Sequence, residues 1–226
     1  MKLVIFDVDN TLTNTGRADQ DCFLQAVNYV FNIKDIDTDW SHYKNVTAIS
    51  ILDQILRAKT GKVPRKREIS DMRDAFLSNL KERSKKRPGE FSEVPGASNM
   101  MTELLRKSEF ASAIATGSFA DGAAFKLEFA KIPYKKYCIA SGAECFTREE
   151  LIDIAVTKAK SVYGVSNFNA VISVGDGIWD LKTASNIGMP FIGVGNKQVL
   201  EQKGVKYWVN DYRDLPGFFN MLSGAV

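Results

Sequence analysis

The chain begins with Leu3-Val4-Ile5-Phe6-Asp7-Val8-Asp9-Asn10-Thr11, a short apolar run that leads directly into two carboxylates. Four consecutive apolar residues without alternation are typical of a strand that is buried on both faces, as in a parallel sheet. Open parallel sheets bind their ligands outside the carboxyl ends of the strands. We therefore expect Asp7 and Asp9 to lie at the binding edge of such a sheet.

Similar apolar runs predict five further strands, at residues 111–115, 137–140, 170–174, 191–194 and 207–209. Helical patterns lie between them, at 100–107, 121–131, 148–163, 180–187 and 199–203. Strands that alternate with helices of this length form βαβ units. The sequence thus predicts an α/β fold with a Rossmann-like, three-layer core built on a parallel sheet.

Residues 13–94 interrupt this alternation, because their apolar residues follow only helical spacing, at 20–31, 48–59 and 66–83. Val94-Pro95-Gly96 marks the return to the sheet, since Pro and Gly commonly separate elements. We predict an inserted all-helical cap domain at 13–94. The core domain then consists of residues 1–12 and 95–226.

The composition excludes several classes of protein. The chain of 226 residues is 45% apolar and 25% charged, as in globular domains, and its net charge of +3 is too small to indicate a nucleic-acid binder. No apolar run approaches the roughly 20 residues of a membrane span, so we expect a soluble protein without a membrane partner. Two basic stretches, 62–67 and 81–87, alternate with acidic residues. This favours a solvated helix face, with a field that attracts an anionic substrate as the alternative.

Cysteine and histidine are too few for several kinds of site. The three cysteines (Cys22, Cys138 and Cys145) form no C-x-x-C pair, which predicts buried, reduced thiols and a cytoplasmic protein. Asp7 also interrupts the first apolar run too early for a signal peptide. The single histidine, His42, excludes mechanisms that need two histidines. The glycine-rich nucleotide loops and the serine-hydrolase motif do not occur.

Polar residues follow three of the predicted strands, and adjacent parallel strands would bring them to one edge. Four of these residues are carboxylates: Asp7, Asp9, Asp176 and Asp180. Like charges this close need a counter-ion, because each raises the pKa of the others. Carboxylate oxygens without Cys or His indicate Mg²⁺ rather than zinc or copper.

The same edge would hold an anion. Thr116 and Ser118 offer hydroxyl donors, and Gly117 lets backbone N–H groups approach closely. A metal, an anion site and two carboxylates two residues apart suggest phosphoryl transfer. On this interpretation Asp7 attacks phosphorus and becomes an aspartyl phosphate. Asp9 protonates the leaving oxygen and then deprotonates the hydrolytic water.

Three stretches resemble three of the four motifs of the haloacid dehalogenase superfamily, in its phosphatase branch: Asp7-Val8-Asp9-Asn10-Thr11-Leu12, Thr116-Gly117-Ser118 and Gly175-Asp176-Gly177-Ile178-Trp179-Asp180. The resemblance covers essentially the whole chain, including the place of the helical cap. It implies a Mg²⁺-dependent phosphatase that acts on a small phosphorylated metabolite, similar to the phosphoglycolate phosphatase group.

The resemblance also implies a role for each matching residue. Asp7 would be nucleophile and metal ligand, and Asp9 general acid and base, with only its backbone carbonyl on the metal. Thr116 and Gly117 would hold the phosphoryl group. Asp176 would ligate Mg²⁺ directly or through water. Asp180 would serve the metal directly or through a neighbour, although a carboxylate at a helix start is favourable in itself.

The fourth motif departs from the family pattern, which has a lysine near the start of the helix before the Gly-Asp strand. Here the sequence Thr147-Arg148-Glu149-Glu150 predicts a helix start with a capping box and places Arg148 there. Arginine can make the same charge contact in bidentate geometry. Lys158 is the rival, but it lies ten residues along the helix, about 15 Å from its start. We therefore favour Arg148.

Two other functions share these motifs. A phosphosugar mutase would return the phosphoryl group of the same aspartyl phosphate to a sugar. A catalytically silent protein would keep the site only to bind a phosphorylated ligand, and Arg148 in place of lysine is its support in the sequence.

Overall fold

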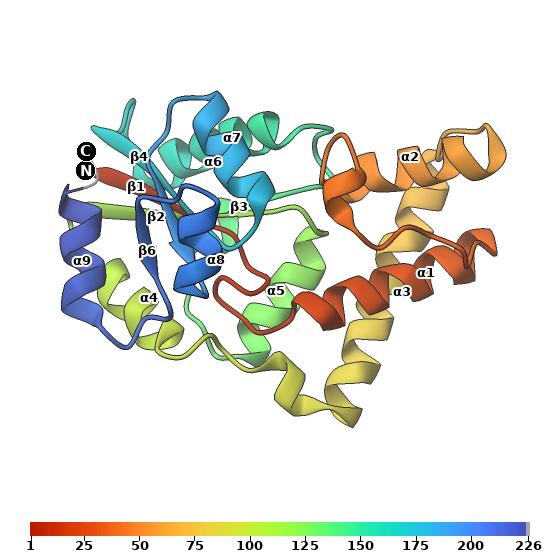
Figure 1. Cartoon of the computed structure of the whole chain (residues 1–226), viewed down its shortest axis with the longest axis horizontal. Helices are drawn as coiled ribbons and strands as arrows, with labels where there is room; N and C mark the ends of the chain where they lie inside the picture. Colours follow the sequence, from red (N-terminus) through yellow and green to blue (C-terminus); the bar gives the residue numbers. More distant parts are fainter. Residues whose placement is uncertain (225–226) are drawn as a thin grey trace.

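A computed structural model describes residues 1–224 and shows a sheet of parallel strands covered by helices on both faces (Figure 1). Within these residues the sheet has six strands in the order β3-β2-β1-β4-β5-β6. The strands are β1 (Lys2–Phe6), β2 (Phe110–Thr116), β3 (Ile139–Ser141), β4 (Ala170–Gly175), β5 (Phe191–Val194) and β6 (Tyr207–Val209). The predicted three-layer α/β fold is confirmed.

Side chains of β1 alternate between two apolar clusters, which explains why the run is apolar throughout. Val4 and Phe6 pack with α4 (Ala97–Arg106), α5 (Ala120–Phe129) and α9 (Leu215–Gly224). On the other face, Leu3 and Ile5 pack with α6 (Arg148–Tyr163). Two further helices, α7 (Ile178–Asn186) and α8 (Lys197–Gln202), cover the β5 side of the sheet.

Between β1 and α4 the described chain is helical and projects beyond the sheet, at the right of Figure 1. It contains α1 (Gly16–Phe31), α2 (Ala48–Thr60) and α3 (Lys66–Lys86), with short 3₁₀ turns at Trp40–His42 and Pro88–Phe91. These helices share an apolar cluster, to which Phe119 at the start of α5 also contributes. The two segments that join it to the sheet are hydrogen-bonded to each other: the N–H of Val94 donates to the carbonyl of Leu12 (2.8 Å), and that of Asn14 to Ser92 (2.8 Å).

Element ends differ from the sequence prediction where apolar spacing carries no information. Helix α1 begins at Gly16 rather than at residue 20, because its first turn is polar. Residues 136–138 form a 3₁₀ turn, so β3 begins only at Ile139. The apolar pattern of the sequence predicts no helix at 215–224, where the structure has α9. Its early Pro216 is compatible with a first helical turn, where the missing N–H has no partner to lose.

The predicted state of the cysteines is confirmed, because all three are buried free thiols. Both basic stretches lie on α3 or beside it. Their exposed Arg65 and Lys85 pair with neighbouring glutamates, as in a solvated face. None of the helices within 1–224 has the length and apolar character needed to span a bilayer.

Candidate active site

Three loops meet at the carboxyl edge of the sheet because β2, β1 and β4 are neighbours in register. Phe6 pairs with Ile114 on one side and with Val174 on the other. The residues that follow the three strands therefore face one cavity of about 540 Å³ between the sheet and the helical segment. Six of the seven sequence-predicted site residues line this cavity: Asp7, Asp9, Thr116, Gly117, Arg148 and Asp176.

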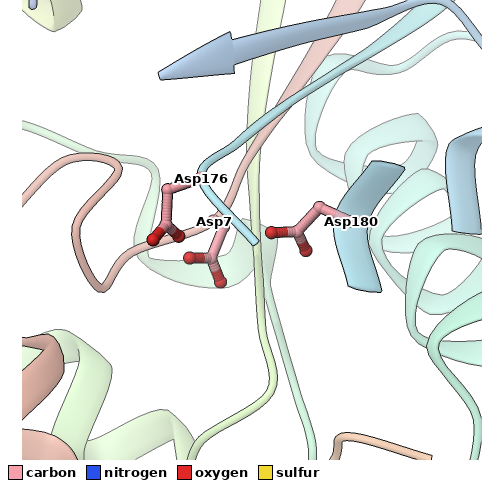
Figure 2. A group of neighbouring side chains, drawn as sticks. All are labelled: Asp7, Asp176 and Asp180. Atoms are coloured by element: carbon pink, nitrogen blue, oxygen red, sulfur yellow. The ribbon is translucent and has the colours of Figure 1, made fainter. Parts of the chain in front are cut away.

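A carboxylate cluster (Asp7, Asp176 and Asp180) lies at the base of this edge. One carboxylate oxygen from each residue lies within 4.8 Å of those of the other two, and Figure 2 shows the three carboxylates next to one another. Burial and repulsion from Asp180 raise the pKa of Asp7 well above its usual value and that of Asp176 to about 7. Burial also raises the pKa of Asp180, against the opposing effect of Arg148. Three neighbouring carboxylates that repel one another, two of them buried and that of Asp176 partly buried, fit a hard divalent cation such as Mg²⁺, which prefers oxygen ligands.

The turn after Asp7 holds this cluster together. Asn10 has a φ of 58°, a left-handed conformation that asparagine tolerates better than most residues. Its amide donates to Asp176 Oδ2 at 3.3 Å. The Thr11 hydroxyl lies 3.4 Å from Asp7 Oδ2 and 3.5 Å from Asp176 Oδ1. Both residues of the turn thus link the loops after β1 and β4.

Arg148 is placed in the cavity by the start of α6. The predicted capping box is present, with Thr147 accepting from the N–H of Glu150. The guanidinium of Arg148 donates through Nη1 to Asp180 Oδ1 (2.6 Å) and through Nε to the carbonyl of Val46 (2.9 Å). The guanidinium also lies over the ring of Trp179, 5.7 Å from its centroid. Trp179 lines the same cavity.

Asp180 itself lies behind Arg148 and does not line the main cavity. Its second oxygen accepts from the N–H of Gly177 at 3.1 Å, as expected for a carboxylate at a helix start. Lys158 lies outside the cavity, where its ammonium donates to Glu144 (2.6 Å) and to the carbonyl of Ile139 (2.7 Å). Of the two candidates for the fourth motif, the structure therefore brings Arg148 to the edge and leaves Lys158 away from it.

Gly117 is required by the close approach of Arg148. A Cβ at this position would lie 2.5 Å from Arg148 Nη2 and 2.8 Å from the carbonyl oxygen of Val46. In the same loop the Thr116 hydroxyl oxygen accepts from the N–H of Ser118 at 3.1 Å. The hydroxyl hydrogen of Thr116 thus remains available to an anion in the cavity.

A second charged group, the lysine cluster (Asp9, Asp19 and Lys126), was missed in the sequence. The Lys126 ammonium is fully buried and contacts both oxygens of Asp9 (2.7 and 2.6 Å) and Oδ1 of Asp19 (2.6 Å). Burial by itself lowers the pKa of Lys126, but the two carboxylates raise it above its usual value. Burial and the neighbouring Asp9 raise the pKa of Asp19 to about 6. The only signal in the sequence is a lysine amid the apolar residues of α5.

Comparisons with known proteins agree with the fold. A family model described as haloacid dehalogenase-like hydrolase matches residues 4–194. A hydrolase from Pseudomonas syringae superposes with a TM-score of 0.70 at 21% identity, over 99% of each chain. β-Phosphoglucomutase from Clostridium difficile superposes with a TM-score of 0.69 at 19% identity, over 99% of this chain and 96% of that one. CbbY from Rhodobacter sphaeroides, in complex with xylulose-(1,5)bisphosphate, superposes with a TM-score of 0.67 at 16% identity, over 95% of this chain and 97% of that one. Curated proteins give no match to the sequence.

Proposed function

The chain belongs to the haloacid dehalogenase-like hydrolase family, and we propose that it is a Mg²⁺-dependent phosphatase that hydrolyses a small phosphomonoester through an aspartyl phosphate. One observation carries the proposal: Asp7, Asp9, the Thr116–Gly117 loop and Asp176 line a single cavity. A cavity of about 540 Å³ fits a small metabolite. The xylulose bisphosphate in the related CbbY structure is of the same class.

Each polar residue has a task in this reaction. An Asp7 oxygen attacks phosphorus, the bond from phosphorus to the leaving oxygen breaks, and that oxygen takes the proton of Asp9. Water then attacks phosphorus and gives its proton to Asp9, and the bond to Asp7 breaks. Inorganic phosphate leaves and the Asp7 carboxylate is restored. The Thr116 hydroxyl and the Gly117 N–H hold the phosphoryl oxygens meanwhile.

Asp7, Asp176 and the backbone carbonyl of Asp9 would hold Mg²⁺, with Asp180 beside them. The ion supplies positive charge that offsets the repulsion between Asp7 and the phosphoryl oxygens. Arg148 takes the part of the family lysine, because its guanidinium lies between Asp180 and the Gly117 loop. We assign Lys158 no part in the reaction.

We further propose that residues 13–94 act as a cap domain that selects the leaving group. The apolar cluster that the three helices share and the paired joining segments support this division. Phe23, Trp40 and Ile51 supply an apolar wall of the cavity opposite the sheet. Closure of such a lid excludes water and strengthens the electrostatic interactions inside.

The test measures phosphate release from 4-nitrophenyl phosphate and a panel of phosphorylated metabolites, with Mg²⁺ or with a chelator. We expect release that needs Mg²⁺ and falls by at least about a thousandfold in Asp7→Asn. Asp153→Asn, an exposed aspartate of α6, is the matched control and should keep full activity. A fully active Asp7→Asn would contradict the proposal.

Two other results would replace the phosphatase by the alternatives. Isomerised sugar phosphate without free phosphate would identify a mutase. Binding of a phosphate ester without release of phosphate over hours would identify a catalytically silent binding protein. The replacement of the family lysine by Arg148 would then be the main candidate for the cause of the lost activity.

A further inference from the structure

Lys126 is buried next to the cavity but does not line it. Lys126 of α5 is fully buried, and it is not among the lining residues, whereas its partners Asp9 and Asp19 are. An isolated buried ammonium is costly unless it is paired and hydrogen-bonded. The three hydrogens of this ammonium match the three carboxylate oxygens around it.

These contacts fix the carboxylate of Asp9 from both sides. Lys126 contacts both of its oxygens, and the Thr15 hydroxyl donates to Oδ1 at 2.6 Å. The side chain of Asp9 keeps 19% of its surface exposed, on the side of the cavity. It is thus held in one place with its open face toward the position of a substrate.

Asp19 anchors the lysine in turn. Its Oδ1 accepts from Lys126 and, at 2.9 Å, from the Ser118 hydroxyl, which belongs to the loop after β2. Asp19 lies in the first turn of α1, and Lys126 lies on the helix that follows β2. The lysine cluster therefore connects the loop of Asp9, the loop of Thr116 and the first helix of the inserted segment.

We infer that Lys126 is a positioning residue that fixes Asp9 for proton transfer to the leaving oxygen, with Asp19 as its second anchor. The inference rests on the proposed phosphatase function. Lys126 touches no reacting atom and acts through Asp9. Its loss should therefore slow the reaction most when the leaving oxygen needs a proton most.

The test compares two substrates of similar shape, 4-nitrophenyl phosphate and phenyl phosphate, in Lys126→Met. The nitro group makes the first a better leaving group, which depends less on an acid. We expect kcat to fall at least about tenfold more on phenyl phosphate than on 4-nitrophenyl phosphate, within the range of general acid catalysis, and KM to change less than about threefold. Lys158→Met, which removes a paired lysine outside the cavity, should affect both substrates equally and little.

Lys126→Met leaves two adjacent carboxylates without their cation, so its folding is checked by circular dichroism and thermal unfolding. The double variant Lys126→Met/Asp19→Asn removes one positive and one negative charge and keeps the charge of the cluster. It should fold even if the single variant does not, and it should show the same preference for the better leaving group.

Equal losses on the two substrates, or no loss in a folded variant, would overturn the role of Lys126 and leave the phosphatase proposal intact. A folded wild-type protein that releases phosphate from neither aryl ester nor any metabolite of the panel would overturn both.

Discussion

Two charge clusters border the same cavity, and they differ in how their carboxylates are paired with a cation. The carboxylate cluster has three acids, and its neighbouring cation, Arg148, hydrogen-bonds to Asp180 alone of the three. In the lysine cluster, by contrast, each hydrogen of one ammonium has a carboxylate oxygen to itself. Burial and repulsion raise the pKa of Asp7 and of Asp176 in the first cluster, and they also raise that of Asp19 in the second, to about 6.

The difference shows what each cluster can do. Asp7 and Asp176, which follow β1 and β4 and have no cation of their own among residues 1–224, can accept a divalent cation and a phosphoryl group. In the lysine cluster one ammonium serves two carboxylates, and its contacts hold the side chain of Asp9 in one position. One sheet edge thus combines a region that binds with a region that orients.

The largest effect should come from breaking the carboxylate cluster with Asp176→Asn. We expect a loss of about a thousandfold in kcat/KM, because a bound metal ion supplies several kcal/mol of charge stabilisation. A Mg²⁺ titration of activity and of thermal stability measures the effect. Asp153→Asn again serves as control, and unchanged Mg²⁺ dependence in Asp176→Asn would show that the cluster holds no metal.

Removal of the positive charge of Arg148, next to the same cluster, should lower the free energy of unfolding. Arg148→Met leaves Asp180 buried without its partner, which should cost about 3 kcal/mol in the free energy of unfolding. Arg148→Lys should cost less, because it keeps the charge. Urea denaturation measures both, and equal stabilities of the Met and Lys variants would contradict a charge effect.

Asp176 should make a contribution of its own to the pH dependence of stability. Burial, chiefly, raises the pKa of Asp176 from 3.8 to about 7, so the folded protein binds its proton more tightly than the unfolded chain does. Without a divalent cation, this group should make the free energy of unfolding fall as the pH rises from about 4 to about 7. Mg²⁺ binds the ionised form and should remove most of that fall.

Denaturation in chelator and in Mg²⁺, at about pH 5 and about pH 7.5, tests this sign. Asp176→Asn provides the matched comparison, because it has no proton to lose at this position. The same slope in Asp176→Asn and in the wild type would assign the pH dependence to other groups.

The smallest effect should follow substitution far from both clusters. Arg65→Ala breaks an exposed pair with Glu68 on the basic face of α3. We expect no measurable change in stability and a change of less than about twofold in KM, because exposed pairs contribute little and are screened by salt. A clear rise in KM that disappears at high salt would instead support a field that attracts the anionic substrate.

Much of the fold followed from the sequence because its signals are local. Runs such as Leu3–Phe6 are apolar throughout, which requires burial on both faces and so identified the strands. Thr147 and Glu150 lie three residues apart, and their capping box fixed the start of α6 and with it the place of Arg148. Helix α9 carried no comparable signal, because Pro216 and Gly217 are equally typical of a turn.

The lysine cluster could not be predicted in this way. Lys126 and Asp9 are 117 residues apart, and Asp19 is 107 residues from Lys126. Nothing in the spacing of α5 distinguishes Lys126 from a cation that extends into solvent. Only the contacts of Lys126 with Asp19 of α1 and with the loop after β1 show that it is buried.

By itself, the sequence determined the parallel sheet, the inserted helical segment and the acidic residues at the strand ends, because burial on two faces and capping leave their mark on neighbouring residues. Tertiary structure alone decided which charges meet. Arg148 donates to Asp180, Lys158 donates to Glu144, and Lys126 lies buried between Asp9 and Asp19. The physical reason is that a buried charge is tolerated only where partners from distant segments converge on it, and that convergence is a property of the packed chain.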